Sequence, residues 1–175
     1  MLVLDGDRLD QNLAQVQSMI PDAAQRRIVI KSLPSLELIR ETSSKLETQN
    51  FMVFHADHLN LIQTHFERAH ILMGKPMPIQ AVRHFYEAHG LVAAKALPIN
   101  WLVDTPERVR QLGDFATEQG LALNVNIEIN IGLYRGGVDS LALMEQMLSV
   151  LAQYKPVLTL SGLMGYDAQV GKVPA

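Results

Sequence analysis

The chain has 175 residues, of which 48% are hydrophobic and 19% are charged, as expected for one globular domain with a hydrophobic core. A formal net charge of -3 and the lack of a basic cluster argue against a nucleic-acid partner, and the absence of cysteine excludes disulfides and thiolate metal sites and favours a reducing cytoplasm. No basic segment followed by an apolar core opens the chain and no apolar run could span a bilayer, so we expect neither a signal peptide nor a membrane partner.

Hydrophobic periodicity predicts strands and helices in alternation along the chain. The expected helices cover residues 7–20, 35–46, 57–66, 79–89, 105–119 and 140–153, with Asp7 and Ser35 as caps of the first two. The expected strands cover residues 27–31, 51–54, 71–73, 101–103, 121–131 and 157–163, and residues 90–99 are expected to form a loop. Strand spacings of about 25 to 30 residues are typical of parallel strands with right-handed crossovers. A doubly wound open sheet and part of a (β/α)8 barrel both fit this α/β pattern.

The fifth predicted strand has two unlike faces. One face is apolar and the other is polar, with Asn124, Asn126, Glu128 and Asn130 alternating with leucine, valine and isoleucine. Strands of parallel sheets are usually apolar on both faces, so the polar face indicates an enclosed polar interior and favours the barrel. The alternative is an exposed edge strand with a polar outer face.

Two basic residues lie at carboxyl ends of predicted strands, where α/β proteins bind their ligands. Lys31 ends the first strand, and a partly desolvated amine there could form a Schiff base. Arg135 follows the fifth strand beside Gly136 and Gly137, and its guanidinium could approach an anion or a phenolate closely. The alternatives are a solvated lysine at a strand end and a loop arginine paired with Asp139.

Three further residues are candidates of the same kind. Tyr166 follows the sixth strand, where a tyrosine could stack, donate a hydrogen bond or act as an acid, or pack under the next loop. Lys75 lies in a stiff Gly-Lys-Pro-Met-Pro loop, which could equally be a turn without a chemical role. His55 follows the second strand and could face the same mouth. The other histidines are expected on the surface, and none has the spacing of a zinc protease site: His58, His65, His70, His84 and His89.

The segment EINIGLYRGGV at 128–138 resembles the E-I-D-x-G-[ML]-x-R-x-G-V signature of the fold-type III pyridoxal-phosphate enzymes. These form the alanine racemase amino-terminal domain family, and the resemblance is greatest to its D-threonine aldolase and D-serine dehydratase branch. IVIKSLPS, ILMGKPMP, INWLVDTPERVRQL and LSGLMGYD resemble the family's segments at strands one, three, four and six, in the same order. The chain departs from the family where Asn130 replaces an acid and where Asp-Ala-Gln follows Tyr166 in place of Glu-Gly-His.

The resemblance implies roles for these residues. Lys31 would hold pyridoxal 5'-phosphate through a Schiff base and move protons at the α-carbon of the substrate. Arg135 would face the phenolic oxygen of the cofactor, and Tyr166 would lie near its ring as a second catalytic residue. His55 and Asn130 complete the expected cofactor-binding set. The implied function is an amino-acid enzyme, a D-amino-acid lyase of the D-threonine aldolase or D-serine dehydratase type. The alternatives are an alanine racemase and a non-catalytic pyridoxal-phosphate-binding protein.

The length of the chain also indicates how much of a β/α barrel it can form. Residues 1–175 would supply about six β/α units, whereas a complete eight-stranded barrel takes about 250 residues. The family's phosphate-binding loops, its carboxyl-terminal β-domain and the divalent-metal site of the aldolase branch would all lie outside this chain. We therefore expect the amino-terminal part of a longer enzyme, inactive alone, which forms a homodimer or self-associates through exposed edges.

Overall fold

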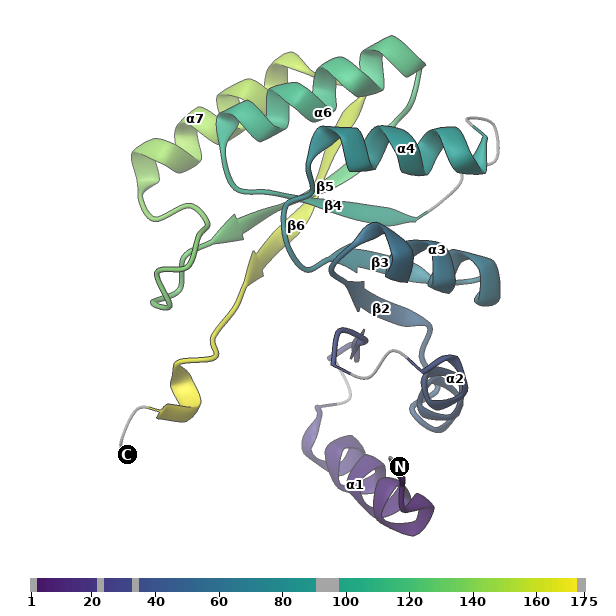
Figure 1. Ribbon diagram of the computed structural model, residues 1–175. Helices are drawn as coiled ribbons and strands as arrows, with labels where there is room; N and C mark the ends of the chain where they lie inside the picture. The colour runs from purple at the N-terminus through teal and green to yellow at the C-terminus, as the bar shows by residue number, and fades with distance from the viewer. Residues whose placement is uncertain (1–2, 22–23, 33–34, 91–97, 173–175) are drawn as a thin grey trace.

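The structure is a computed structural model that describes residues 3–21, 24–32, 35–90 and 98–172. At its centre is one parallel sheet whose six strands lie side by side in sequence order (Figure 1). A doubly wound sheet would reverse its strand order at a switch point, so this order is that of the first six units of a β/α barrel. The strands are β1 (Ile28–Val29), β2 (Asn50–Val53), β3 (His70–Met73), β4 (Ile99–Val103), β5 (Leu123–Ile129) and β6 (Leu158–Gly165).

Helices connect the strands, and α4, α6 and α7 lie together over one face of the sheet (Figure 1). Side-chain oxygens of Ser35, Thr105 and Ser140 accept a backbone N–H and so cap α2, α6 and α7. Asp5 caps the first helix, so the prediction of Asp7 is wrong. None of the helices in the described ranges is long and apolar enough to cross a membrane. The helices are α1 (Gly6–Met19), α2 (Leu36–Lys45), α3 (Ala56–His65), α4 (Ile79–His89), α6 (Pro106–Gln119), α7 (Leu141–Gln153) and a 3-10 turn (Val170–Lys172).

The face of the sheet that meets the helices forms the hydrophobic core. Val125 and Ile127 of β5 are fully buried there, and burying each such side chain contributes about 1.5–3 kcal/mol. Trp101 of β4 donates its indole N–H to the Tyr86 hydroxyl of α4 at 3.1 Å, which satisfies the polar end of each ring. Burial raises the pKa of Tyr86 to about 12. The apolar half of the predicted alternation therefore packs against the helices, as expected.

The opposite face of β5 is polar and is also buried. Asn126 and Glu128 are only 8% and 5% exposed, and β5 pairs with a strand on each side. These observations exclude the exposed edge strand. Opposite Asn126 lies Gly162 of β6, where a Cβ atom would come within 3.3 Å of the Asn126 Nδ2 atom. The glycine thus leaves room for an amide inside the barrel.

Several predicted boundaries differ from the structure. The first strand, expected over 27–31, comprises only Ile28–Val29, and the fifth ends at Ile129 because the chain then turns. The fourth strand begins at Ile99, two residues earlier than expected. Most of the expected loop at 90–99 lies outside the described residues. Hydrophobic periodicity does not predict the hydrogen bonds of the loops, so the predicted ends of strands are less accurate than their positions along the chain.

Although β1 is short, Arg27 ties it to two neighbouring strands. Its Nη1 atom donates to the carbonyl oxygens of Phe51 at 3.0 Å and His70 at 2.9 Å. Its Nη2 atom lies 3.0 Å from His70 Nδ1, and burial together with the Arg27 charge lowers the pKa of His70. The neutral ring can then accept from the guanidinium. This clamp at the amino ends of β1, β2 and β3 holds the strand that leads to Lys31.

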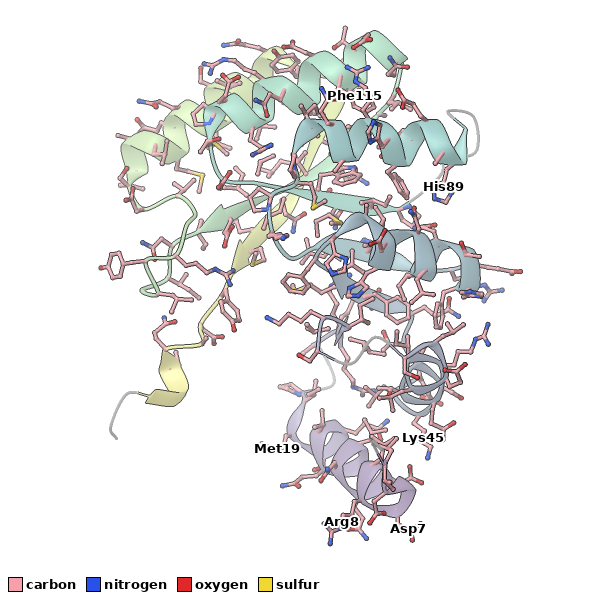
Figure 2. The ribbon with its side chains drawn as sticks, in the orientation of Figure 1. Asp7, Arg8, Met19, Lys45, His89 and Phe115 are labelled. Atoms are coloured by element: carbon pink, nitrogen blue, oxygen red, sulfur yellow. The ribbon has the colours of Figure 1, made fainter. Side chains whose placement is uncertain are left out.

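The first helix is attached mainly through polar contacts. Lys45 of α2 forms ion pairs with Asp10 of α1 and, at 2.9 Å, with Glu41 of its own helix. Gln17 of α1 donates its side-chain N–H to the Lys45 carbonyl at 2.9 Å. No α1 side chain is buried, and Figure 2 shows Met19 and the rest of α1 beyond α2, away from the sheet. This helix therefore does not contribute to the site described next.

Candidate active site

The carboxyl ends of the first five strands line one cleft of about 320 Å³. In a parallel sheet these ends all lie at the same edge, so residues from distant parts of the chain meet there. Two basic residues proposed from the sequence, Lys31 and Arg135, lie in this one cleft. The lining residues are Lys31, Phe54, Gly74, Lys75, Pro76, Asp104, Glu128, Arg135 and Gly136.

The Lys31 amine lies between two aromatic rings. Its Nζ atom is 4.7 Å from the centroid of the Phe54 ring and 5.3 Å from that of the Tyr166 ring. A cation over an aromatic face is attracted by the ring quadrupole. Gly74 allows the Phe54 ring to take this place, since a Cβ atom on Gly74 would come within 2.4 Å of the ring. Lys31 is exposed, so its amine is open to a ligand that enters the cleft.

Arg135 contacts the same tyrosine. Its guanidinium carbon is 4.4 Å from the centroid of the Tyr166 ring, and its Nη2 atom is 3.5 Å from Glu128 Oε1. The guanidinium thus pairs with Glu128 rather than with Asp139. The Arg135 side chain is 44% exposed, whereas the Glu128 side chain is only 7% exposed. The buried carboxylate therefore holds one side of the guanidinium and leaves its outer side free.

The turn that presents Arg135 depends on Asn130 and Gly137. The Asn130 Oδ1 atom accepts the backbone N–H groups of Gly132 and Tyr134, both at 3.1 Å. Gly137 has φ +89°, and a Cβ atom there would come within 2.8 Å of the Ile129 backbone. The chain can therefore fold back against β5 only with glycine at this position. Asn130 organises the loop, and its expected contact with the cofactor stays a prediction.

Tyr166 connects these groups. It follows β6, is 38% exposed, and lines a small hollow that adjoins the cleft together with Asn130 and Leu133. Its ring lies near both Lys31 and Arg135. Two cations proposed from separate strand ends, Lys31 and Arg135, therefore converge on one aromatic ring.

His55 lies apart from this arrangement. It is the exposed residue that precedes α3, and it is absent from the lining of the cleft as the described residues form it. Its ring packs on the ring of His58, with the centroids 3.8 Å apart. The expectation that His58 lies on the surface is wrong: it is 8% exposed, because the first turn of α3 folds it against the protein, and burial lowers its pKa. The cofactor contact expected for His55 stays a prediction.

Two carboxylates of the cleft were not proposed from the sequence. Burial raises the pKa of Glu128, Asp104 adds to this rise, and Arg135 opposes it. The alternation of β5 already placed Glu128 on the polar inner face, and Asp104 directly follows β4. The sequence places both carboxylates near strand ends, but it does not show that Glu128 pairs with Arg135.

Comparison with known proteins agrees with this architecture. Residues 4–174 match the family described as alanine racemase, N-terminal domain. The chain belongs to this family. A search of curated proteins finds no match.

Solved structures share the fold of the alanine racemase N-terminal domain. D-threo-3-hydroxyaspartate dehydratase from Delftia sp. HT23 superimposes with a TM-score of 0.78 at 19% identity, over 98% of this chain and 44% of that one. D-threonine aldolase from Filomicrobium marinum gives 0.78 at 19% identity, over 95% and 43%. Alanine racemase from Clostridium difficile 630 gives 0.70 at 15% identity, over 94% and 43%. The chain thus spans less than half the length of these proteins.

The contact between Gly74 and Phe54 leads to a prediction about the cleft. In Gly74→Ala the new methyl group would overlap the Phe54 ring, which is partly exposed and can turn outward. We expect a loss of about 1–3 kcal/mol in the free energy of unfolding, as for other overpacked sites, and faster acetylation of Lys31. Urea unfolding and peptide mapping after acetic anhydride treatment measure the two effects.

Gly136→Ala is the matched control, because Gly136 lines the same cleft and a Cβ atom there has no neighbour within 4 Å. It should leave both the stability and the Lys31 labelling rate unchanged. If Gly74→Ala also leaves the labelling rate unchanged, Phe54 does not shield the amine.

Proposed function

We propose that this chain forms the pyridoxal-phosphate-binding part of an enzyme that acts on amino acids. The observation that carries the proposal is the convergence of Lys31 and Arg135 on the Tyr166 ring, in a cleft at the carboxyl ends of the strands. Membership of the alanine racemase N-terminal domain family supports the same function. The similarity of the fold to three solved enzymes at 15–19% identity is consistent with this function, but it does not indicate which reaction is catalysed.

The donor set of the cleft fits this cofactor. Lys31 offers an exposed primary amine for an aldehyde, and Arg135 offers the free side of its guanidinium to a phenolate. The aromatic faces of Phe54 and Tyr166 lie on either side of the amine, where a flat heterocycle could stack.

Each residue has a defined task in this proposal. When bound, pyridoxal phosphate supplies an electron sink for charge that develops on the α-carbon of the substrate. Lys31 would hold the cofactor through its amine and would hold or move a proton at the α-carbon of the substrate. Arg135 would donate to the phenolic oxygen, and its ion pair with Glu128 would keep the guanidinium in place. Tyr166 would lie beside the bound cofactor, since the Lys31 amine lies over its ring.

For the reaction we propose a lyase that acts on D-amino acids with a β-hydroxyl group. The dehydratase and the aldolase among the similar structures act, by their names, on such compounds. Racemisation of alanine is the second candidate, because alanine racemase shares the fold. Assays of the proposed longer enzyme with D-threonine, D-serine and both enantiomers of alanine distinguish them: a carbonyl product indicates a lyase, and inversion without one indicates a racemase. Binding of the cofactor by that enzyme without turnover of any of these compounds would indicate the non-catalytic alternative.

The proposal extends to partners. We propose that the chain works in the cytoplasm with further barrel units or as a homodimer, and that a divalent metal, if used, is bound by residues outside this chain. Leu160 and Leu163 on β6 are 42% and 57% exposed, which is apolar surface at an edge of the sheet that another segment could cover. Alone, residues 1–175 should bind the cofactor weakly, show no turnover and self-associate, and light scattering measures the last property.

Trapping with borohydride tests the proposed function on this chain even if binding is weak, since reduction fixes each bound molecule irreversibly. The chain is incubated with pyridoxal phosphate, reduced and mapped by mass spectrometry. A pyridoxyl group predominantly on Lys31 is the expected result. Predominant labelling of Lys75 or Lys95 would contradict the assignment.

A further inference from the structure

Lys75 lies at the middle of the arc of strands that lines the cleft. It follows Gly74 at the end of β3, whereas Lys31 follows β1 and Arg135 follows β5. Strand order places β3 between the other two. Lys75 therefore lies in the same cleft as Lys31 and Arg135, at the end of the strand midway between theirs.

The backbone that carries Lys75 is fixed on both sides. The Gly74 N–H donates to the Val53 carbonyl at 2.7 Å, and Arg108 donates to the Met77 carbonyl at 2.7 Å. Pro76 sets its own φ and restricts the residue before it, which is Lys75. Because this backbone is already fixed, binding of a ligand by Lys75 costs only the rotational freedom of its side chain.

The charge of Lys75 has no partner within the described part of the chain. Three cations and two carboxylates line the cleft. Arg135 pairs with Glu128, and the Lys31 amine faces two rings. Across the described ranges, the Lys75 amine has no carboxylate within 4.0 Å and makes no hydrogen bond. It is therefore the cation of the cleft that is available to a further anionic group.

We propose that Lys75 binds a second anionic group of the substrate, so that the site prefers amino acids whose side chain carries a carboxylate. This inference rests on the proposed function, which assigns Lys31 and Arg135 to the cofactor. Asp104 directly follows the neighbouring strand β4 and is partly exposed in the same cleft. Its carboxylate would repel a second carboxylate but accepts a hydrogen bond from a hydroxyl beside it, so a β-hydroxyl next to the side-chain carboxylate satisfies both residues.

Protection of individual lysines from acetylation tests this without turnover. The whole chain is treated with acetic anhydride in the presence of D-aspartate, D-asparagine or inorganic phosphate, and each lysine is followed by peptide mapping. D-aspartate and D-asparagine differ in the charge of the side chain. Each has one α-amine, so both consume the same amount of acetic anhydride. Lys155 is exposed outside the cleft and serves as the internal reference. With the site about two-thirds occupied by D-aspartate, Lys75 labelling should fall about threefold, because only free sites react.

Matched variants extend the test to the rest of the cleft. D-aspartate should slow the labelling of Lys31 in the wild type and in Lys155→Met, and this protection should be lost in Lys75→Met. Lys75 and Lys155 are both exposed, so neither change should affect folding, which circular dichroism checks.

Three outcomes overturn the inference. Equal protection by D-aspartate and D-asparagine would show that Lys75 binds the α-carboxylate or no specific group. No protection by D-aspartate would show that it is a solvated lysine. Protection by phosphate alone would assign it to the phosphate of the cofactor. Failure of the proposed function is recognised separately, because the borohydride experiment reports on Lys31 with pyridoxal phosphate and contains no amino acid.

Discussion

Lys31→Met should reduce the pyridoxyl group fixed by borohydride about tenfold or more. Only a primary amine can form the bond that is reduced, and Lys31 is the amine that lies between Phe54 and Tyr166 in the cleft. Methionine has a similar length and no amine, so packing on the two rings is largely kept. The residual label should be spread over surface lysines. Mass spectrometry of the reduced chain gives the total label and its distribution.

Lys155→Met is the control for this experiment, since Lys155 is exposed and lies outside the cleft. The amount of pyridoxyl group on Lys31 in this variant should equal that in the wild type. Circular dichroism should show that both variants are folded. If Lys31→Met keeps its total label on a single other lysine, that lysine is the anchor and the assignment of Lys31 fails.

Gly113→Ala should destabilise the protein, against the usual preference of helices for alanine. Gly113 is buried in α6, and a Cβ atom there would come within 2.2 Å of the Tyr154 ring at the end of α7. The ring is held in place because its hydroxyl donates to Asp114 at 2.7 Å. Helix propensity alone predicts that the free energy of unfolding rises by about 1 kcal/mol, whereas overpacking predicts that it falls by about 1–3 kcal/mol. The sign of the change in the free energy of unfolding, measured in urea, decides between them.

Two further variants isolate the cause. Gly6→Ala changes a helical glycine whose Cβ atom would have no neighbour within 4 Å, so it should be neutral or slightly stabilising. Adding Tyr154→Ala to Gly113→Ala should remove most of the strain, so the two changes together should cost less than the sum of the single changes. Additive effects would show that the ring and the methyl group do not collide.

The order of elements and the two faces of β5 could be predicted from the sequence, because both depend on local periodicity. Val125 and Ile127 pack on the helices, and Asn126 and Glu128 face the interior, as alternation requires. The places of Lys31, Arg135 and Tyr166 at strand ends follow from the same pattern. In a parallel sheet all such ends share one edge, so their approximate meeting could be expected as well.

Local periodicity was thus enough to predict which elements form and which of these residues stand at the carboxyl edge of the sheet. Three features depend on tertiary contacts: the pairing of Arg135 with Glu128 rather than Asp139, the position of Tyr166 near both cations, and the burial of His58. The strand order, which distinguishes a barrel from a doubly wound sheet, is also known only from the structure. The physical reason is that periodicity reports the two sides of one element, whereas a contact between elements depends on strand register, sheet twist and the hydrogen bonds that shape the loops.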